Sequence, residues 1–369
     1  MNKRIEEEDR MNLTDELAWA TMREREELIR SNYSHTVRTS SQERADEPAI
    51  NGDQVVFVRD LRKTYAGGIE ALKGISFEVG EGEIFGMLGP NGAGKTTTIG
   101  ILTTTVRPSG GRVLVAGHDV VRDPLAVRRT IGVTFQESVL DNDFSGLDNL
   151  RLHARLWRVP RAEADERIAA LLDAMDLTDR ARDGVRTYSG GMRRRLEITR
   201  ALLANPRVLF LDEPTLGLDP TVRQDIWEAI EQLRLRYGVT VVLSTHYLEE
   251  AERVCDRVAI IHEGRIVALD TPKALLKALG EEAVELKVDA DPVTVLPALA
   301  GLRLNGSSPL VLGKTITIPL AEGGAQAGTL MDEIRSSSVS VAAMGIRRTT
   351  LNDAFLKLTG AGVNGHNGS

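Results

Sequence analysis

A glycine-rich stretch between an apolar run and a helix-forming segment limits what this chain can fold into. Gly89–Thr97 reads Gly-Pro-Asn-Gly-Ala-Gly-Lys-Thr-Thr and matches G-x-x-x-x-G-K-[ST] in full. The apolar Ile84–Leu88 precedes it and Thr97–Leu102 can form a helix, so the order is strand, loop, helix. Glycines let such a loop adopt positive φ and bring its N–H groups against phosphate oxygens. The stretch therefore predicts a nucleotide triphosphate site.

Two residues of this loop carry the predicted chemistry. Lys95 would place a positive charge on the β- and γ-phosphates, and the hydroxyl of Thr96 would bind Mg²⁺. The alternative is a glycine-rich turn that matches the motif by chance. The residues predicted to contact the nucleotide here are Gly89, Pro90, Asn91, Gly92, Ala93, Gly94, Lys95, Thr96 and Thr97.

Charge and composition exclude some classes of protein. The chain has 369 residues with 46 Lys+Arg against 53 Asp+Glu, a net charge of −7, so no overall basic surface favours nucleic acid as a partner. The single cysteine, Cys255, cannot form an intramolecular disulfide and is interpreted as a buried structural thiol in a reducing cytosol. Neither a transmembrane span nor a secretory signal is predicted, so any membrane role would go through a partner.

Changes in pattern along the chain indicate an α/β protein with several parts. The N-terminal segment is charged and polar; a weakly ordered extension is one interpretation of it, and a docking or regulatory helix is the other. The C-terminal part alternates short strands and helices, which favours a small α+β accessory domain. The predicted boundaries are 1–50 for the extension, 51–280 for the main domain with a helical insertion at about 137–187, 281–360 for the accessory domain, and 361–369 for a flexible tail.

Polar residues end two apolar runs that are predicted as parallel strands. Asp212 and Glu213 follow Val208–Leu211, and His246 follows a second run, with a helix between the two strands. The carboxyl ends of such strands are where an α/β sheet places its ligand. We predict that Asp212 holds the Mg²⁺ shell, whereas Glu213, which points the other way because strand side chains alternate, faces the γ-phosphate and can accept a proton from water. The alternative is a carboxylate pair that caps the next helix.

Two further features allow more than one interpretation. Tyr65 closes a predicted strand and could stack on an adenine ring, or pack within the strand. Arg193, Arg194 and Arg195 lie in the first turns of a helix opened by Ser189, where a run of arginines is typically a solvated face.

Six motifs in order resemble those of an ABC-type ATPase over roughly residues 54–277. They are Gly89–Thr97, Gln136, Tyr188-Ser-Gly-Gly-Met192, Leu211-Asp-Glu-Pro214, Gly217-Leu-Asp-Pro220 and His246. The resemblance implies a P-loop NTPase fold, with a RecA-like core, an antiparallel β subdomain and a helical insertion. It also implies ATP and Mg²⁺ as cofactors.

The resemblance also implies a role for each matching residue. Tyr65 would stack on adenine, Gln136 would join Thr96 and Asp212 at Mg²⁺, Glu213 would be the general base, and His246 would hold the γ-phosphate. The residues that would act across an ATP-dependent dimer of cassettes are Ser189, Gly190, Gly191 and Asp219.

The departures from the common pattern narrow the family. The signature here is Tyr-Ser-Gly-Gly-Met instead of Leu-Ser-Gly-Gly-Gln, but its phosphate contacts Ser189 and Gly191 are kept. Together with the ending Leu351–Gly360, it is similar to the daunorubicin/doxorubicin-resistance exporter ATPases. That group implies multidrug efflux of a drug, antibiotic or lipid-like substrate. It also implies a second ATPase cassette, and a homodimer is expected. A separate membrane-spanning permease would bind residues from about 137 to 158, which would place the chain at the cytoplasmic face of a bacterial membrane.

Two other functions are compatible with the motifs. A soluble ABC ATPase acting on ribosomes or DNA would need no membrane partner; the single cassette and the acidic balance count against it. The ATPase of an importer would differ only in its partner, and the accessory domain argues mildly against this alternative.

Overall fold

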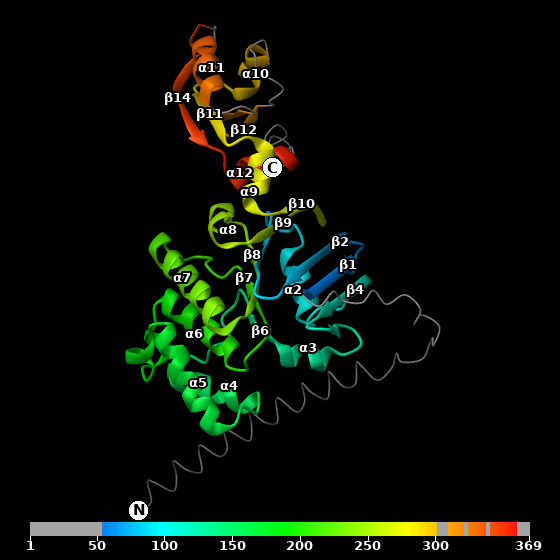
Figure 1. The fold of residues 1–369 in the computed structure, drawn as a ribbon, viewed down its shortest axis with the longest axis vertical. Coiled ribbons are helices and arrows are strands. Elements are labelled where there is room, and N and C mark those ends of the chain that lie inside the picture. The colour runs from blue at the N-terminus through cyan, green and yellow to red at the C-terminus, as the bar shows by residue number, and fades with distance from the viewer. Residues whose placement is uncertain (1–53, 301–308, 321–323, 337–339, 360–369) are drawn as a thin grey trace, which may run out of the picture. The chain divides into compact units, whose positions relative to one another are not determined.

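The computed structural model describes residues 54–300, 309–320, 324–336 and 340–359 (Figure 1). The predicted helix of the N-terminal extension lies outside these residues. Within them, no helix combines the length and apolar character needed to cross a membrane.

A six-stranded sheet forms the centre of the main domain, because its strands are apolar on both faces. Its order is β10-β9-β3-β8-β7-β6; all neighbours are parallel except the edge strand β10. All five residues of β3 and of β7 are buried, as expected where helices cover both faces. The strands are β3 (Ile84–Leu88), β6 (Ile131–Thr134), β7 (Val208–Asp212), β8 (Thr240–Thr245), β9 (Arg257–His262) and β10 (Arg265–Asp270).

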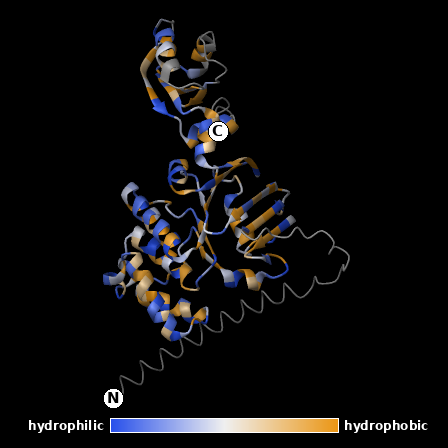
Figure 2. Cartoon of the chain, viewed as in Figure 1, coloured by the Kyte–Doolittle hydropathy of each residue, from blue (hydrophilic) through white to orange (hydrophobic). Residues whose placement is uncertain are grey.

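An antiparallel sheet of order β2-β1-β4-β5 packs beside the central one. Val58 of β1 pairs with Phe77 of β2 and with Val113 of β4, so β1 lies between the two. Figure 2 shows hydrophobic colouring along these strands, in keeping with their buried alternate residues. The strands are β1 (Gln54–Thr64), β2 (Glu70–Gly80), β4 (Gly110–Val115) and β5 (His118–Asp119).

Helices follow the strands of the central sheet, and four of them begin at side-chain caps, the fourth being Thr271 before α9. Ser145, Ser189 and Asp219 each accept a hydrogen bond from a backbone N–H in the first turn of their helix. Two 3₁₀ turns, Thr178–Arg180 and Val185–Thr187, separate α5 from α6. The helices are α2 (Lys95–Leu102), α3 (Pro124–Thr130), α4 (Gly146–Leu156), α5 (Arg161–Ala174), α6 (Gly190–Leu202), α7 (Pro220–Tyr237), α8 (Leu248–Val254) and α9 (Pro272–Leu279).

The C-terminal part forms its own antiparallel sheet, of order β12-β13-β11-β14, with a core of its own. Its last helix nevertheless belongs partly to the main domain: Leu351 is fully buried in the largest core cluster there, and its N–H donates to Glu252 of α8. The elements are β11 (Glu282–Val288), α10 (Pro292–Ala300), β12 (Leu310–Leu312), β13 (Thr315–Leu320), α11 (Gly324–Ser336), β14 (Val341–Arg348) and α12 (Leu351–Thr359).

Candidate functional site

The phosphate-binding loop lies between β3 and α2, and its shape requires glycine. Gly89 has φ +154°, and a Cβ there would lie 2.2 Å from the carbonyl oxygen of Ile261. Gly94 has φ +111° and precedes α2 directly; a Cβ there would meet Leu72 at 2.7 Å. The loop thus passes close to two other segments and turns its backbone toward the start of α2, where N–H groups favour anions.

Lys95 is held inside this loop. Its side chain is only 5% exposed, and Nζ donates to the carbonyl oxygens of Gly89 at 2.8 Å and Pro90 at 3.2 Å. It also lies 3.4 Å from Oε1 of Glu213. A buried ammonium needs such compensation. The charge is therefore fixed where the loop would hold phosphate.

Asp212 and Glu213 lie on the same side of the site, which corrects the sequence argument. Alternation along a strand had placed their side chains on opposite faces, but β7 ends at Asp212 and Glu213 has φ +49°. This left-handed residue turns the chain, so that Oδ1 of Asp212 accepts from Thr96 Oγ1 at 3.4 Å while Glu213 reaches Lys95. Both carboxylates face the phosphate loop.

His246 completes the cluster. Its Nδ1 lies 2.9 Å from Oε2 of Glu213, and its ring packs on that of Tyr247 with centroids 4.1 Å apart. The guanidinium of Arg223 lies over the ring of Tyr247, 4.0 Å from its centroid, and donates a hydrogen bond to Glu250. His246 is about one-third exposed, so its ring stands at the edge of the site between buried protein and solvent.

Tyr65 lies beside the loop with its ring accessible. Its side chain hydroxyl is 3.3 Å from Oγ1 of Thr97, the ammonium of Lys63 lies over the ring at 4.8 Å, and the residue is 40% exposed. An exposed aromatic face next to a phosphate loop can stack on a base.

The signature residues and Asp219 do not join this cluster. Among the described residues, no hydrogen bond links Ser189 or Asp219 to the phosphate loop, and both are exposed helix caps. A Cβ on Gly191 would lie 2.4 Å from Val222, so glycine lets the starts of α6 and α7 touch. Gln136, after β6, is exposed as well.

The tyrosine that departs from the common signature has a structural reason. Tyr188 is 4% exposed, and its hydroxyl donates to the carbonyl oxygen of Arg180 at 2.6 Å. Gly146 makes room for it, since a Cβ there would lie 2.4 Å from that hydroxyl. Burial of the phenol raises the pKa of Tyr188, which keeps it a neutral donor. Tyr188 thus anchors the start of α6 while the next residue, Ser189, stays exposed.

Sequence reasoning missed Ser244, at the end of β8. Its hydroxyl donates to Oδ1 of Asp212, and its hydroxyl and carbonyl oxygens accept from the N–H of Glu213 at 3.1 and 3.2 Å. A signal was present, because Ser244 directly follows the apolar residues of the predicted strand that ends at His246.

The donor set near Asp212 suits a hard cation. A carboxylate next to a hydroxyl offers oxygen ligands, which Mg²⁺ prefers, and Mg²⁺ is commonly held by one or two such groups together with substrate phosphates and water. Within the described residues there is no group of three or more His, Cys, Asp or Glu able to hold a metal by itself. The residues thus fit a cation that arrives with a nucleotide.

Comparisons with known proteins agree with this geometry. The pattern of the ABC transporter family matches residues 72–216. The doxorubicin resistance ATP-binding protein of Mycobacterium tuberculosis H37Rv is 40% identical over 314 residues, which are 84% of this chain and 95% of that protein. The Nod factor export ATP-binding protein I of Ralstonia nicotianae is 37% identical over 329 residues, covering 85% and 96%.

Solved structures share the fold of the main domain. The ABC transporter subunit cbiO1 from Clostridium perfringens is 29% identical, with a TM-score of 0.57 over 60% of this chain and 90% of that one. A dimeric post-hydrolysis ATP-binding cassette bound to ADP and Pi is 28% identical, with a TM-score of 0.53 over 58% and 98%.

Fold and site together define a P-loop nucleotide triphosphatase with an α/β core, as predicted. The chain belongs to the family of ABC transporter ATP-binding subunits: it is an ATPase that binds ATP. Its resemblance to the daunorubicin/doxorubicin-resistance group is confirmed by 40% identity, over 307 residues, to the daunorubicin/doxorubicin resistance ATP-binding protein of Streptomyces peucetius (81% of this chain and 91% of that protein). The prediction of the ATP-binding subunit of an ABC-type exporter is confirmed at this level.

Proposed function

We propose that this ATPase powers export of a drug-like, antibiotic or lipid-like compound through a separate membrane-spanning permease. The observation that carries the catalytic part is the position of Glu213, whose two carboxylate oxygens lie 3.4 Å from Lys95 and 2.9 Å from His246. A carboxylate held between two phosphate-binding groups is placed to accept a proton from a water that attacks the γ-phosphoryl group.

Each side chain then has a part in hydrolysis. Lys95 and the loop N–H groups hold the β- and γ-phosphates, and His246 holds the γ-phosphate while Glu213 takes the proton of the attacking water. The bond between the γ-phosphorus and its bridging oxygen breaks, which leaves ADP and phosphate. Tyr65 stacks on the adenine.

Mg²⁺ fits the oxygens of Thr96 and Asp212, and Gln136 is assigned to it as a third ligand. When bound, the ion neutralises charge on the phosphates. The protein's own part is to hold Asp212 rigidly, which the Ser244 hydroxyl does by donating to its carboxylate.

A second cassette completes the site. Ser189 and Gly191 begin α6 at the surface, where helix N–H groups and a serine hydroxyl suit an anion. In this proposal they contact the γ-phosphate on the opposite cassette, together with Gly190, and Asp219 lies at the interface. A homodimer is the expected form, with residues 51–280 as the cassette, 281–360 as an accessory domain, and the N-terminal 50 residues and last nine outside both.

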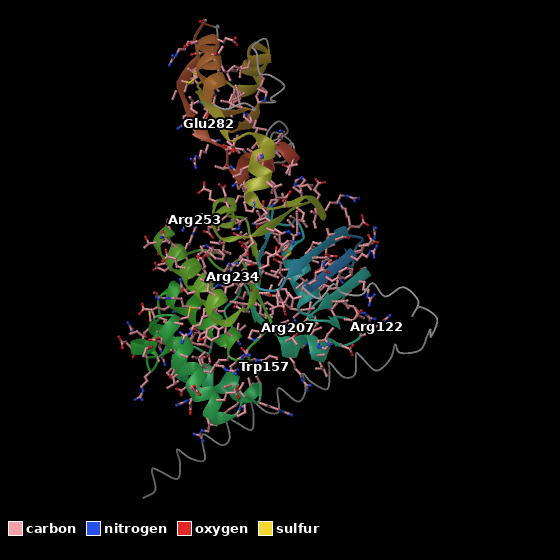
Figure 3. The ribbon with its side chains drawn as sticks, viewed as in Figure 1. Arg122, Trp157, Arg207, Arg234, Arg253 and Glu282 are labelled. Carbon is pink, nitrogen blue, oxygen red and sulfur yellow. The ribbon has the colours of Figure 1, made fainter. Side chains whose placement is uncertain are left out.

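The helical segment offers a surface for the permease. Exposed apolar side chains gather between residues 137 and 158, and each is at least 40% exposed. They are Val139, Phe144, Leu152, Leu156 and Trp157, the last labelled in Figure 3. Apolar groups gathered this way are typical of a protein interface. Docking there would place the ATPase peripherally at the cytoplasmic face of the membrane.

The catalytic assignment is tested by Glu213→Gln and Lys95→Ala, with the exposed Lys273→Ala as control. We expect Glu213→Gln to bind ATP normally and to lose turnover by roughly 10²–10⁴-fold, the usual contribution of a general base. Lys95→Ala should lose ATP affinity in calorimetry, and Lys273→Ala should retain both properties. Near-normal hydrolysis by Glu213→Gln would remove Glu213 from its role, and unchanged affinity of Lys95→Ala would contradict the phosphate assignment.

The docking surface is tested with Leu152→Glu/Leu156→Glu and with Leu235→Glu, a 67% exposed leucine on α7, as control. We measure recovery of the chain with inverted membrane vesicles of cells that carry the complete complex. The double variant should be lost from the vesicles while its ATP binding persists, and the control should remain bound. Equal recovery of the wild type, the double variant and the control would overturn the permease proposal. Sedimentation of the wild type with ribosomes instead of membrane vesicles would overturn it as well.

A further inference from the structure

Glu213 occupies a backbone conformation that must be held by its surroundings. Its φ of +49° lies in the left-handed region, which costs free energy for a residue with a Cβ. The N–H of Glu213 is tied to Ser244 on the neighbouring strand. That bond fixes one side of the turn, so the carbonyl side needs a partner of its own.

Arg194 supplies this partner. Its Nη2 donates to the carbonyl oxygens of Asp212 at 2.9 Å and Glu213 at 3.1 Å, and its Nε donates to Pro214 O at 2.8 Å. One side chain therefore holds three consecutive carbonyls of the turn. Only a guanidinium has donors arranged in a fixed planar fork that can do this; an ammonium cannot.

The other side of the same guanidinium reaches the segment before Gln136. Nη1 of Arg194 donates at 2.8 Å to the carbonyl oxygen of Phe135 and at 2.8 Å to Glu197 Oε2. The side chains of Arg194 and Glu197 are 9% and 5% exposed, so the pair is buried and its charges compensate each other. The predicted solvated face is therefore wrong for Arg194.

The neighbouring arginines show that this placement is specific. Arg193 donates to the carbonyl oxygen of Arg186, and Arg195 donates to that of Met175 at 3.1 Å and pairs with Asp176. None of these partners belongs to the phosphate loop or to the turn at Glu213. Only the middle residue of the three is directed at the turn that carries Glu213.

We propose that Arg194 is a positioning residue for ATP hydrolysis. It holds Glu213 in the left-handed conformation, and this keeps the Glu213 carboxylate between Lys95 and His246. Without the fork, the turn relaxes toward ordinary φ values and the carboxylate leaves that place. The inference rests on the proposed function, because it acts through Glu213 as general base.

The test removes the buried pair as a unit, so that neither charge is left alone. In the full-length protein, Arg194→Met/Glu197→Met is compared with Arg195→Met, which removes an arginine–carbonyl bond and an ion pair from the same helix. Turnover, the Michaelis constant and ATP affinity are measured, with circular dichroism to confirm folding. We expect the paired variant to lose kcat on the order of 10–100-fold, the cost of a misplaced catalytic group, with ATP affinity within about threefold of wild type. Arg195→Met should retain kcat within about threefold.

A double-mutant cycle with Glu213→Gln separates positioning from a general structural role. If Arg194 acts through Glu213, adding the paired change to Glu213→Gln should lower the remaining turnover by less than about twofold. Arg194→Lys should not rescue activity, because the ammonium lacks the fork. Should the Met pair fail to fold, Arg194→Gln/Glu197→Gln keeps a neutral polar pair and is put through the same cycle.

The outcomes distinguish this inference from the proposed function. Three outcomes would each overturn the positioning role: a large additive loss of turnover in the cycle, a normal kcat in the folded paired variant, or an equal loss of kcat in Arg195→Met. In all three cases Glu213→Gln would still be inactive, so the proposed function would stand. Near-normal turnover of Glu213→Gln would instead contradict the proposed function on which the inference rests.

Discussion

His153 on α4 should make the stability of the protein depend on pH. Its ring packs edge-on against Trp157 with centroids 5.8 Å apart, and its Nδ1 lies 3.5 Å from Nη1 of Arg200. Burial, and secondly the positive charge of Arg200, lower the pKa of His153 to about 3 from its ordinary value of 6.5. In the unfolded chain the imidazole regains the ordinary pKa, so between those values the unfolded state binds the extra proton.

The sign and size of the effect follow from this difference. The neutral folded imidazole contributes stability that is present above pH 6.5 and is lost as the pH falls from there toward 3. For a fully buried ring with this pKa, the free energy of unfolding would fall by about 2 kcal/mol between pH 7 and pH 5. Because the ring is only half-buried, we expect a fall of ~1–2 kcal/mol.

The measurement is urea unfolding at pH 7, 6 and 5 for wild type and His153→Gln. Glutamine keeps a polar group near Arg200 but does not titrate, and the other histidines are present in both proteins. The free energy of unfolding is plotted against pH for each protein, and the difference between the two slopes is due to His153. The variant should lose ~1–2 kcal/mol less than wild type over this range. Parallel slopes would refute the argument that burial keeps this ring neutral.

Two further predictions concern the packing of the central sheet. Burial raises the pKa of the Cys255 thiol, so iodoacetamide at pH 8 should label it only when urea unfolds the protein. Mass spectrometry should detect no labelling of the native state, and equal labelling rates with and without urea would contradict this prediction. Gly132→Ala places a Cβ 2.3 Å from the carbonyl oxygen of Ala201, so β6 and α6 must separate and the free energy of unfolding should fall by about 1–3 kcal/mol in urea titration. Gly328→Ala in α11 meets nothing within 4 Å and should be neutral or stabilising, so equal losses in both variants would show that the clash is not the cause.

Much of the site could be predicted because its signals are local. The glycines of Gly89–Thr97 report a backbone that approaches other segments, and Ser189 and Asp219 precede helices as caps usually do. The strand that ends at Asp212 shows its burial by being apolar throughout. Each of these requirements acts within a few residues of its own position, so a single sequence displays it.

The remainder depended on neighbours from distant parts of the chain. Alternation failed at Glu213 because a strand period cannot show where the strand ends, and the left-handed turn is held by Ser244 and Arg194 from other elements. Likewise, three successive arginines look alike until the packing of α6 on β6, next to the end of β7, decides which one is buried. The core position of Leu351, from the far end of the chain, was hidden for the same reason.

One helix connects two sites that the proposed function treats as separate. Ser189 caps the exposed start of α6, where it would contact a γ-phosphate on the opposite cassette, and Arg194 lies five residues further along, about 7.5 Å by helix rise. Since Arg194 donates hydrogen bonds to the carbonyl oxygens of Asp212 and Glu213, we expect a displacement of α6 at Ser189 to be felt at the turn that carries the proposed base of the chain's own site. The nucleotide of the second cassette would then act through α6 in two ways. Ser189 of this chain would complete the γ-phosphate contacts of that nucleotide. The same contact would influence the position of Glu213 through Arg194.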